Sequence, residues 1–195
     1  MSSRENILKA ALENQPEFVA LPEINLDGVI AYESLPAQFD LILTRIGGTV
    51  EHFQDASALL ARMASHSPEE LVINTINADA ERLTHINGLN SVQLEAVDVA
   101  YVRGALGVAE NGAVWMDEKA MVNRLLPFIC QHLVVVLKAS EIVPTMHHAY
   151  QHIEVNKTGF GSFIAGPSKT ADIEQSLVIG AHGPRSLTLL LLMAD

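Results

Sequence analysis

Residues 162–192 read SFIAGPSKTADIEQSLVIGAHGPRSLTLLLL. This stretch holds apolar segments with the length of β-strands, separated by two loops that contain glycine and proline: Ser162–Ala165, Leu177–Ile179 and Ser186–Leu192. The last segment is apolar at nearly every position instead of alternating, which is typical of a parallel strand buried on both faces. The stretch therefore predicts a sheet that other elements cover on both sides.

Helices and strands alternate with short connections along the rest of the chain. We expect further strands at Thr49–Phe53, Leu71–Asn74, Val97–Val102, Ala113–Met116 and His132–Leu137. We expect helices over residues 2–14, from Pro36 to the pair Gly47-Gly48, after an N-cap at Asp55, and over Thr145–Asn156. This order predicts an α/β fold with a mainly parallel sheet and helices on both faces. We expect residues 1–195 to form a single domain, with the N-terminal helix packed onto it.

Composition narrows the class of protein. Hydrophobic residues make up 49% of the 195 residues and the mean hydropathy is +0.22, which excludes a disordered chain. The formal net charge of −11 disfavours binding to nucleic acid, because phosphate backbones repel an acidic surface. No apolar run approaches the roughly 18 residues that membrane insertion needs, and the first residues do not resemble a signal peptide. We expect a soluble, cytoplasmic protein.

The cysteine count limits cofactors. Cys130 is the only cysteine in the chain. A single cysteine excludes a disulfide within the chain, a four-cysteine zinc site and an iron–sulfur cluster held by this chain alone. We therefore predict no cofactor bound by this chain alone.

The first glycine–proline loop is a candidate anion site. Its residues Gly166, Ser168, Lys169, Thr170 and Asp172 follow a strand and precede a helix-like segment. Free backbone N–H groups and an ammonium at such a turn suit a phosphate or a carboxylate. Alternatively, Ser168 or Thr170 caps the helix and the acidic residues that follow favour its positive end.

The second loop, Gly180–Arg185, offers further groups for an anion. His182 titrates near neutral pH, Arg185 can bind an oxyanion with two hydrogen bonds, and Gly183 shapes the backbone between them. A simple turn between two strands would need little more than these residues. The spacing leaves open whether both loops face one pocket.

A carboxylate stands at the tip of a third loop. Glu110 immediately precedes Asn111-Gly112, the dipeptide of a tight turn. There it could act as a nucleophile or a general base. The alternative is a solvated turn carboxylate.

Three histidines lie on one predicted helix. His148 and His152 are spaced i, i+4, so both can reach one metal ion from a single helical face, and His147 is adjacent. The sequence shows no third ligand. We therefore predict no metal site and keep His148 and His152 as its candidates, the alternative being a partly exposed helix.

The run Gly166–Leu192 resembles the C-terminal signature of the LutC/YkgG lactate-utilisation family of LUD-domain proteins. That signature reads Gly-Pro-Ser-Arg/Lys-Thr-Ala-Asp-Ile-Glu and then Leu-Val-x-Gly-x-His-Gly-Pro, and both parts occur here. Arg4-x-x-Ile7-Leu8, the helix leading to Gly47-Gly48 and Gly107–Gly112 stand in the expected order. The family more usually has Ala-Glu-Thr-Gly where this chain has Asn111 before Gly112.

The resemblance implies a NagB/RpiA/CoA-transferase-like fold, in agreement with the α/β prediction. It also implies a subunit of a system that oxidises L-lactate to pyruvate, with iron–sulfur clusters in cysteine-rich partner subunits. From motif and chemistry together, Lys169 and Thr170 are expected to bind a substrate carboxylate or a cofactor phosphate. His182 and Arg185 would assist by hydrogen bonding, and Glu110 would line the same pocket.

Two other functions fit the same sequence. The Glu110 turn resembles the active-site turn of CoA-transferases, which would make the chain a free-standing acyl-transfer enzyme with a glutamyl thioester. The chain could instead be a non-catalytic assembly subunit whose two C-terminal loops dock a partner. Whether this chain carries out chemistry by itself stays open from the sequence.

Overall fold

The structure is a computed structural model that describes residues 2–20, 22, 24–26, 28–154, 159–171 and 177–194. Its helices are α1 Ser3–Glu13, α2 Leu35–Arg45, α3 Ala56–Met63, α4 Ala80–Gly88, α5 Ser91–Glu95, α6 Glu118–Met121, α7 Leu126–Ile129 and α8 Met146–His152, with a 3₁₀ helix at Ala139–Glu141. Its strands are β1 Thr49–Phe53, β2 Val72–Asn74, β3 Val99–Arg103, β4 Leu106–Val108, β5 Ala113–Asp117, β6 His132–Lys138, β7 Ile142–Val143, β8 Gly161–Ile164, β9 Lys169–Ala171, β10 Leu177–Ile179 and β11 Ser186–Leu192.

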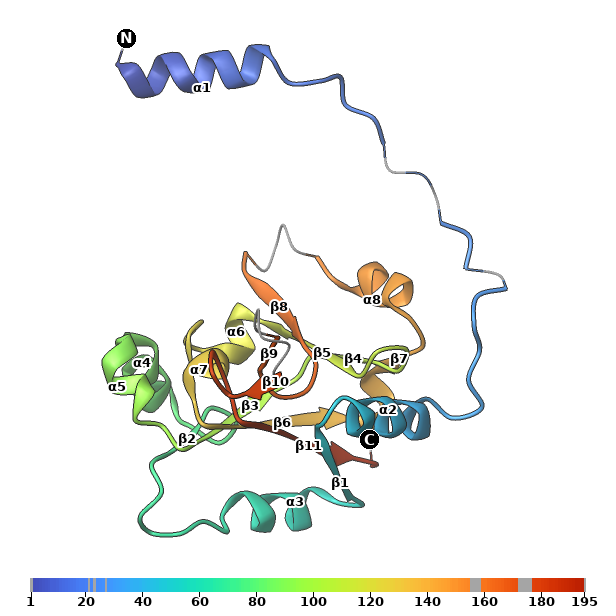
Figure 1. The fold of residues 1–195 in the computed structure, drawn as a ribbon, viewed down its shortest axis with the longest axis vertical. Coiled ribbons are helices and arrows are strands. Elements are labelled where there is room, and N and C mark those ends of the chain that lie inside the picture. The colour runs from blue at the N-terminus through green and yellow to red at the C-terminus, as the bar shows by residue number, and fades with distance from the viewer. Residues whose placement is uncertain are drawn as a thin grey trace.

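A five-stranded sheet in the order β1-β11-β6-β3-β2 forms the centre of the molecule (Figure 1). All of its strand pairs are parallel, so the predicted α/β fold with a parallel sheet is confirmed. The two most apolar strands, β6 and β11, lie side by side in the middle, with Leu189 opposite Val135. This position explains why they lack alternation, because both faces of a central strand are covered.

A second sheet, which the sequence analysis did not separate from the first, has the order β7-β4-β5-β8. Its β4–β5 and β5–β8 pairs are antiparallel and only β4–β7 is parallel. Side chains of β5 join α2 in the core on one face of the parallel sheet, through Val114, Met116, Phe39 and Leu43. That face is therefore covered by a sheet as well as a helix, which differs from the expected helices alone.

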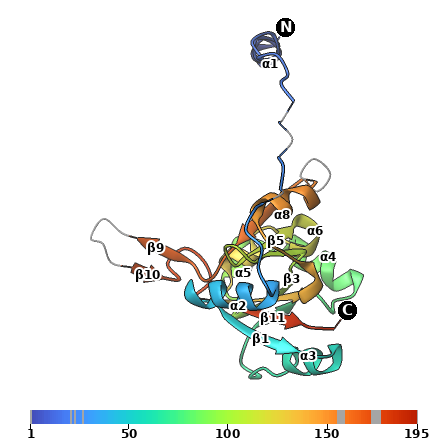
Figure 2. The same cartoon turned by 90° about the vertical axis from the view of Figure 1, so that its right-hand side faces the viewer.

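Helix α3 covers the other face of the parallel sheet (Figure 2). Asp55 caps the helix as predicted, since its carboxylate accepts a hydrogen bond from the Ala58 N–H. Leu59 and Met63 of α3 pack against Tyr101 and Leu190 of the sheet. The sheet is thus buried between two separate apolar layers.

The segment after Gly166 is a strand, where the sequence analysis expected a helix-like segment. Residues 169–171 form β9 and pair antiparallel with β10, Thr170 opposite Val178 and Lys169 opposite Ile179. β-Branched residues at three of these four positions favour extended backbone, which explains the outcome. The alternative role of Ser168 or Thr170 as a helix cap is therefore wrong, and Asp172 lies outside the described residues.

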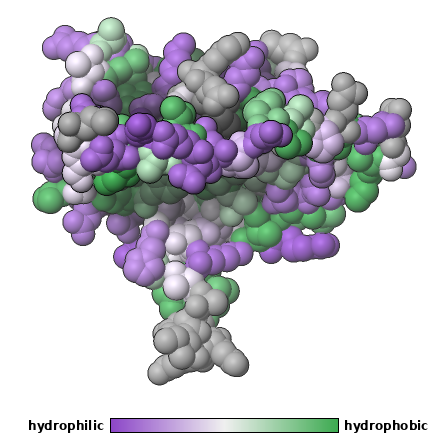
Figure 3. Space-filling view, turned by 90° about the horizontal axis from the view of Figure 1, so that it is seen from above, coloured by the Kyte–Doolittle hydropathy of each residue, from purple (hydrophilic) through white to green (hydrophobic). Residues whose placement is uncertain are grey.

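The β9–β10 hairpin stands away from the body of the molecule (Figure 2). Hydrophobic side chains lie along this projecting hairpin (Figure 3), and Leu177, Val178 and Ile179 of β10 are 62%, 43% and 51% exposed. The hairpin therefore adds little to the core, although its base is close to the predicted anion loops.

Helix α1 lies apart from the domain, at the end of an extended segment (Figure 1). Ser2 and Glu5 form a capping box at its start, which stabilises the helix locally. Its apolar residues Ile7, Leu8 and Leu12 are 66%, 53% and 69% exposed. The packing of this helix onto the domain stays a prediction, because local capping and helical periodicity fix a helix but not its docking site. No helix in the described part of the chain has the length and apolar character needed to cross a membrane.

Asn123 ties the end of α4 to the loop after α6. It is 7% exposed, and its side-chain amide donates to the carbonyls of Ile86, Asn87 and Leu89 at 3.1, 3.3 and 3.0 Å. We expect Asn123→Ala to lower the free energy of unfolding by about 1–3 kcal/mol, because buried carbonyls lose their donor. Urea unfolding measures this, and Asn87→Ala on the exposed side of α4 is the control; equal midpoints for the two variants would contradict the role.

Candidate functional site

The two C-terminal glycine–proline loops lie against each other. The Ser168 N–H donates to the Pro184 carbonyl at 2.9 Å, and the Gly180 N–H donates to the Ser168 carbonyl at 3.0 Å. The β9–β10 hairpin makes this possible, because it returns the chain to the point where it left the domain. The structure thus brings together the loops that the sequence analysis could not place relative to each other.

The C-terminal end of α2 forms the third side of this arrangement. Gly166 has a φ of +70°, and a Cβ atom there would lie 3.0 Å from the Ile46 carbonyl oxygen. The Lys169 ammonium donates a hydrogen bond to that same carbonyl. We call the end of α2 at Ile46–Gly48, the loop Gly166–Lys169 and the loop Gly180–Arg185 the C-terminal loop cluster.

The contact of Lys169 with α2 changes its expected role. The last carbonyls of a helix lack intrahelical partners and carry partial negative charge, so a lysine there stabilises the helix end. The predicted anion ligand is therefore already engaged by the Ile46 carbonyl, and an anion would have to compete with it. The sequence analysis missed Ile46; its one signal was Gly47-Gly48, which marks the helix end.

In the C-terminal loop cluster, the side chains of His182 and Arg185 are accessible to a ligand. Both residues are exposed, and their side chains have no hydrogen bond or ion pair with the described part of the chain. The Arg185 N–H donates to the Gln131 carbonyl at 2.8 Å, immediately before β6 and β11 begin. The cluster thus lies at the amino end of the parallel sheet, whereas α/β sheets usually bind ligands at the carboxyl end.

Glu110 lies in the predicted tight turn, between β4 and β5. Gly112 has a φ of +69° and packs against the backbone of Leu43 in α2. The Glu110 carboxylate accepts a hydrogen bond from the Met146 N–H at 2.9 Å, at the start of α8. The hydrogen bonds described for Glu110 thus join it to Pro144 and Met146, not to the C-terminal loop cluster with which it was expected to share a pocket.

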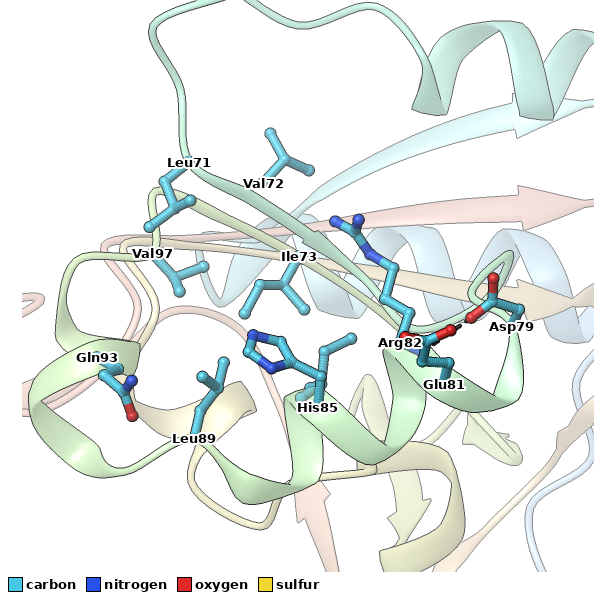
Figure 4. A pocket seen from close by; sticks show the side chains of 11 residues that line it. Leu71, Val72, Ile73, Asp79, Glu81, Arg82, His85, Leu89, Gln93 and Val97 are labelled. Atoms are coloured by element: carbon cyan, nitrogen blue, oxygen red, sulfur yellow. Dashed lines mark hydrogen bonds between the residues drawn. The ribbon is translucent and has the colours of Figure 1, made fainter.

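Two cavities lie elsewhere in the domain. One, of about 580 Å³, lies between β2 and the helices α4 and α5 (Figure 4). The other, of about 430 Å³, lies at the carboxyl ends of β2 and β3, where Arg103 and Lys119 contribute cations. Arg103 is paired with Glu141 at 2.7 Å. The sequence analysis included none of these residues among its candidate sites, although Arg103 directly follows a predicted strand.

Comparison with known families shows to which family the chain belongs. The LUD domain family matches residues 64–192, which include β2 to β11 and both C-terminal loops. The chain belongs to the LUD-domain family. The resemblance that the sequence motifs indicated is therefore confirmed.

Relatives of this LUD domain include proteins named Lactate utilization protein C. The one from Shouchella clausii is 35% identical over 98 residues, which cover 47% of this chain and 42% of that protein. The one from Bacillus pumilus is 28% identical over 171 residues, which cover 82% of this chain and 69% of that protein. The matched segment thus spans between about two fifths and two thirds of these relatives' length.

The LUD fold is also found in a solved structure. A crystal structure of a DUF162 family protein from Deinococcus radiodurans superposes with a TM-score of 0.61 at 20% identity. The match covers 81% of this chain and 96% of that one. This likeness supports the fold alone.

The three histidines considered as metal ligands lie on α8, as predicted, although the helix is shorter than expected. The His148 Nδ1 atom is 2.9 Å from the Thr145 hydroxyl, which gives this imidazole a protein partner. His147 and His152 are exposed. Within the described residues no three His, Cys, Asp or Glu side chains come close enough to hold a metal ion. The pair His148 and His152 therefore remains a two-residue candidate.

Cys130 is fully buried in the core. Burial raises the pKa of its thiol from 9.0 to about 12, because a thiolate is poorly solvated there. We expect a thiol reagent at pH 8 to modify the folded protein far more slowly than the protein in urea. Equal rates in the two conditions would contradict the burial.

The same thiol links stability to pH. Between pH 9 and about 12 the thiol ionises in the unfolded chain while it stays protonated in the fold. The contribution of the protonated thiol to the free energy of unfolding is therefore complete below pH 9, and it is lost as the pH rises from 9 to about 12. Urea unfolding at pH 8 and pH 10 tests this, with Cys130→Ala expected to show the smaller difference between the two.

Proposed function

We propose that this LUD domain is a subunit of a lactate-utilisation system that oxidises L-lactate to pyruvate together with iron–sulfur partner proteins. The names of its relatives and the paired C-terminal motifs support the system. The observation that carries the proposal is the C-terminal loop cluster, in which both family-typical motifs meet although 10 residues separate Lys169 from Gly180 in the sequence. A shared surface is what a common functional role for the two motifs requires.

The chemistry of the reaction calls for partners. Conversion of L-lactate to pyruvate removes two electrons and two protons, one from the hydroxyl group and one from C2. Iron–sulfur clusters in proteins are held mainly by cysteine thiolates. Cys130, the single cysteine, is buried with its thiol pKa raised to about 12, so it is not available as a cluster ligand. The electrons therefore pass to clusters in the partner subunits.

His182 and Arg185 are the groups through which the loop cluster acts. They are exposed and unpaired within the described part of the chain, so the Arg185 guanidinium and the His182 imidazole are open to an incoming anion. A substrate carboxylate or an acidic surface of a partner subunit presents the required chemistry. Lys169 and Thr170 lie at the base of the same hairpin and would contribute from its other strand.

The proposal is tested in cells that encode the chain. An anaerobic pull-down of the tagged protein from lactate-grown cells is expected to recover cysteine-rich iron–sulfur proteins. Deletion of the gene is expected to abolish growth on L-lactate but not on pyruvate. Recovery of the chain alone, together with unimpaired growth of the deletion strain, would overturn the proposal.

Variants then test whether the C-terminal loop cluster is needed for the proposed function. We expect His182→Ala with Arg185→Ala to impair growth on L-lactate by at least tenfold in rate or to abolish recovery of the partners, because both charges are lost. The double variant His147→Ala with Lys9→Ala, which removes an exposed histidine of α8 and an exposed cation of α1, is the matched control. Equal growth and equal recovery for the two double variants would contradict the role of the cluster.

A further inference from the structure

The parallel sheet ends in an open edge at β2. This strand is last in the order of the sheet and pairs with β3 alone. Backbone groups on one side of β2 are used in that pairing, for example the Thr75 N–H that donates to the Tyr101 carbonyl at 3.0 Å. On the other side, α4 runs beside the strand, and the cavity of about 580 Å³ lies between them (Figure 4).

The wall of this cavity is mainly hydrophobic. Leu71, Val72 and Ile73 line it from β2 and the residue before, Val97 lines it from the start of β3, and Leu89 lines it from the end of α4. Leu71 is 48% exposed, so part of this apolar wall is open to solvent. An apolar cavity of this size matches the dimensions of small-molecule sites in proteins.

Helix α4 directs the side chains of an arginine and a histidine into the same space. Arg82 and His85 are three residues apart, so they lie on one face of the helix, and Figure 4 shows both side chains pointing toward β2. A helix that packs on a sheet edge normally presents apolar residues there. Ile86 of the same helix covers Ile73 and Val97, so the part of the apolar wall that stays open to solvent lies at Leu71.

Within the described residues these two side chains also lack partners. Arg62, Arg103 and Arg124 form ion pairs at 2.7–2.8 Å with glutamates. In the described residues the side chains of Arg82 and His85 have no hydrogen bond or ion pair. Of the two carboxylates at the cavity, Asp79 caps the Arg82 N–H, and Figure 4 shows Asp79 and Glu81 at the end away from Val97.

We propose that this cavity binds an aliphatic carboxylate. The carboxylate lies between the Arg82 guanidinium and the His85 imidazole, and the hydrocarbon chain extends along Leu71, Ile73 and Val97. The Arg82 guanidinium, which has no ion pair among the described residues, argues for the anion, and the His85 imidazole can donate a second hydrogen bond to it. The apolar wall, which is open to solvent at Leu71, argues for a chain longer than that of a two- or three-carbon acid, because burying each further CH₂ group against it is favourable. The site is separate from the C-terminal loop cluster, so this inference does not depend on the proposed function.

The test is a titration of the full-length protein followed by heteronuclear NMR. Octanoate is expected to bind and to shift amide signals of β2 and α4, whereas octanol, which lacks the carboxylate, and acetate, which lacks the chain, are each expected to bind at least tenfold more weakly. Binding of acetate as tight as that of octanoate, or shifts confined to the C-terminal loop cluster, would overturn the proposal.

Matched variants identify the anion-binding groups. Arg82→Gln and His85→Gln are each expected to weaken octanoate binding about tenfold, which is the effect of losing one charge-assisted hydrogen bond. Arg45→Gln and His147→Gln, which alter exposed helix residues elsewhere, are the controls. Equal affinities in all four variants would assign octanoate to nonspecific apolar binding and overturn the site.

Discussion

Replacing Gly166 by Ala is expected to lower the free energy of unfolding by about 1–3 kcal/mol, which is the range for a strained backbone position. Gly166 has a φ of +70°, a region that residues with a Cβ atom seldom adopt. The new Cβ atom would also lie 3.0 Å from the Ile46 carbonyl oxygen, which is backbone and cannot move away as a side chain could. That carbonyl holds the Lys169 ammonium, so the substitution disturbs the C-terminal loop cluster at its centre.

Urea unfolding followed by the fluorescence of Trp115, the single tryptophan, measures this change. Gly88→Ala is the matched control, because Gly88 ends α4 and a Cβ atom there would meet nothing within 4 Å. Alanine favours a helix over glycine by about 1 kcal/mol, so the control is expected to be neutral or stabilising. A Gly166→Ala protein as stable as the Gly88→Ala protein would show that the loop cluster tolerates a side chain at this position.

Local signals in the sequence were sufficient to predict most elements of the fold. Thr49–Phe53, Leu177–Ile179 and Ser186–Leu192 are strands with the predicted bounds, and the cap at Asp55 is where the sequence placed it. The strand at residues 169–171 was not predicted, because a loop rich in Ser, Thr and Asp resembles the start of a helix. Its conformation is decided by pairing with the strand β10. Pairing between distant segments is not visible in a local pattern.

The candidate site, too, could be predicted from the sequence only in part. Chemistry and motif selected Lys169, His182 and Arg185, and the structure does bring their loops together. The Ile46 carbonyl that binds Lys169 lies 123 residues earlier, and no local signal could connect the two. Arg82 and His85 were also missed, because no element was predicted between Leu71–Asn74 and Val97–Val102, so the helix α4 that carries both side chains to the cavity was not foreseen.

Leu189→Ala is expected to have the largest effect on stability, a loss of about 2–5 kcal/mol, the range for buried leucines. Leu189 is fully buried in β11, opposite Val50 of β1 on one side and Val135 of β6 on the other. Because β strands on both sides hold the backbone in place, the sheet cannot collapse into the space that the side chain leaves. A residual cavity adds to the loss of buried apolar surface.

The control for this variant is Leu60→Ala on α3, where the side chain is 44% exposed and belongs to neither core cluster. It makes the same chemical change in a helix that favours alanine, so its unfolding midpoint is expected to stay close to that of the native protein. Similar losses for both variants would mean that the centre of the sheet is less tightly packed than the structure shows. A large loss confined to Leu189→Ala would show that packing at the β1–β11–β6 centre stabilises the domain. The C-terminal loop cluster is attached to the same strands, since Arg185 directly precedes β11 and its N–H donates to the Gln131 carbonyl before β6.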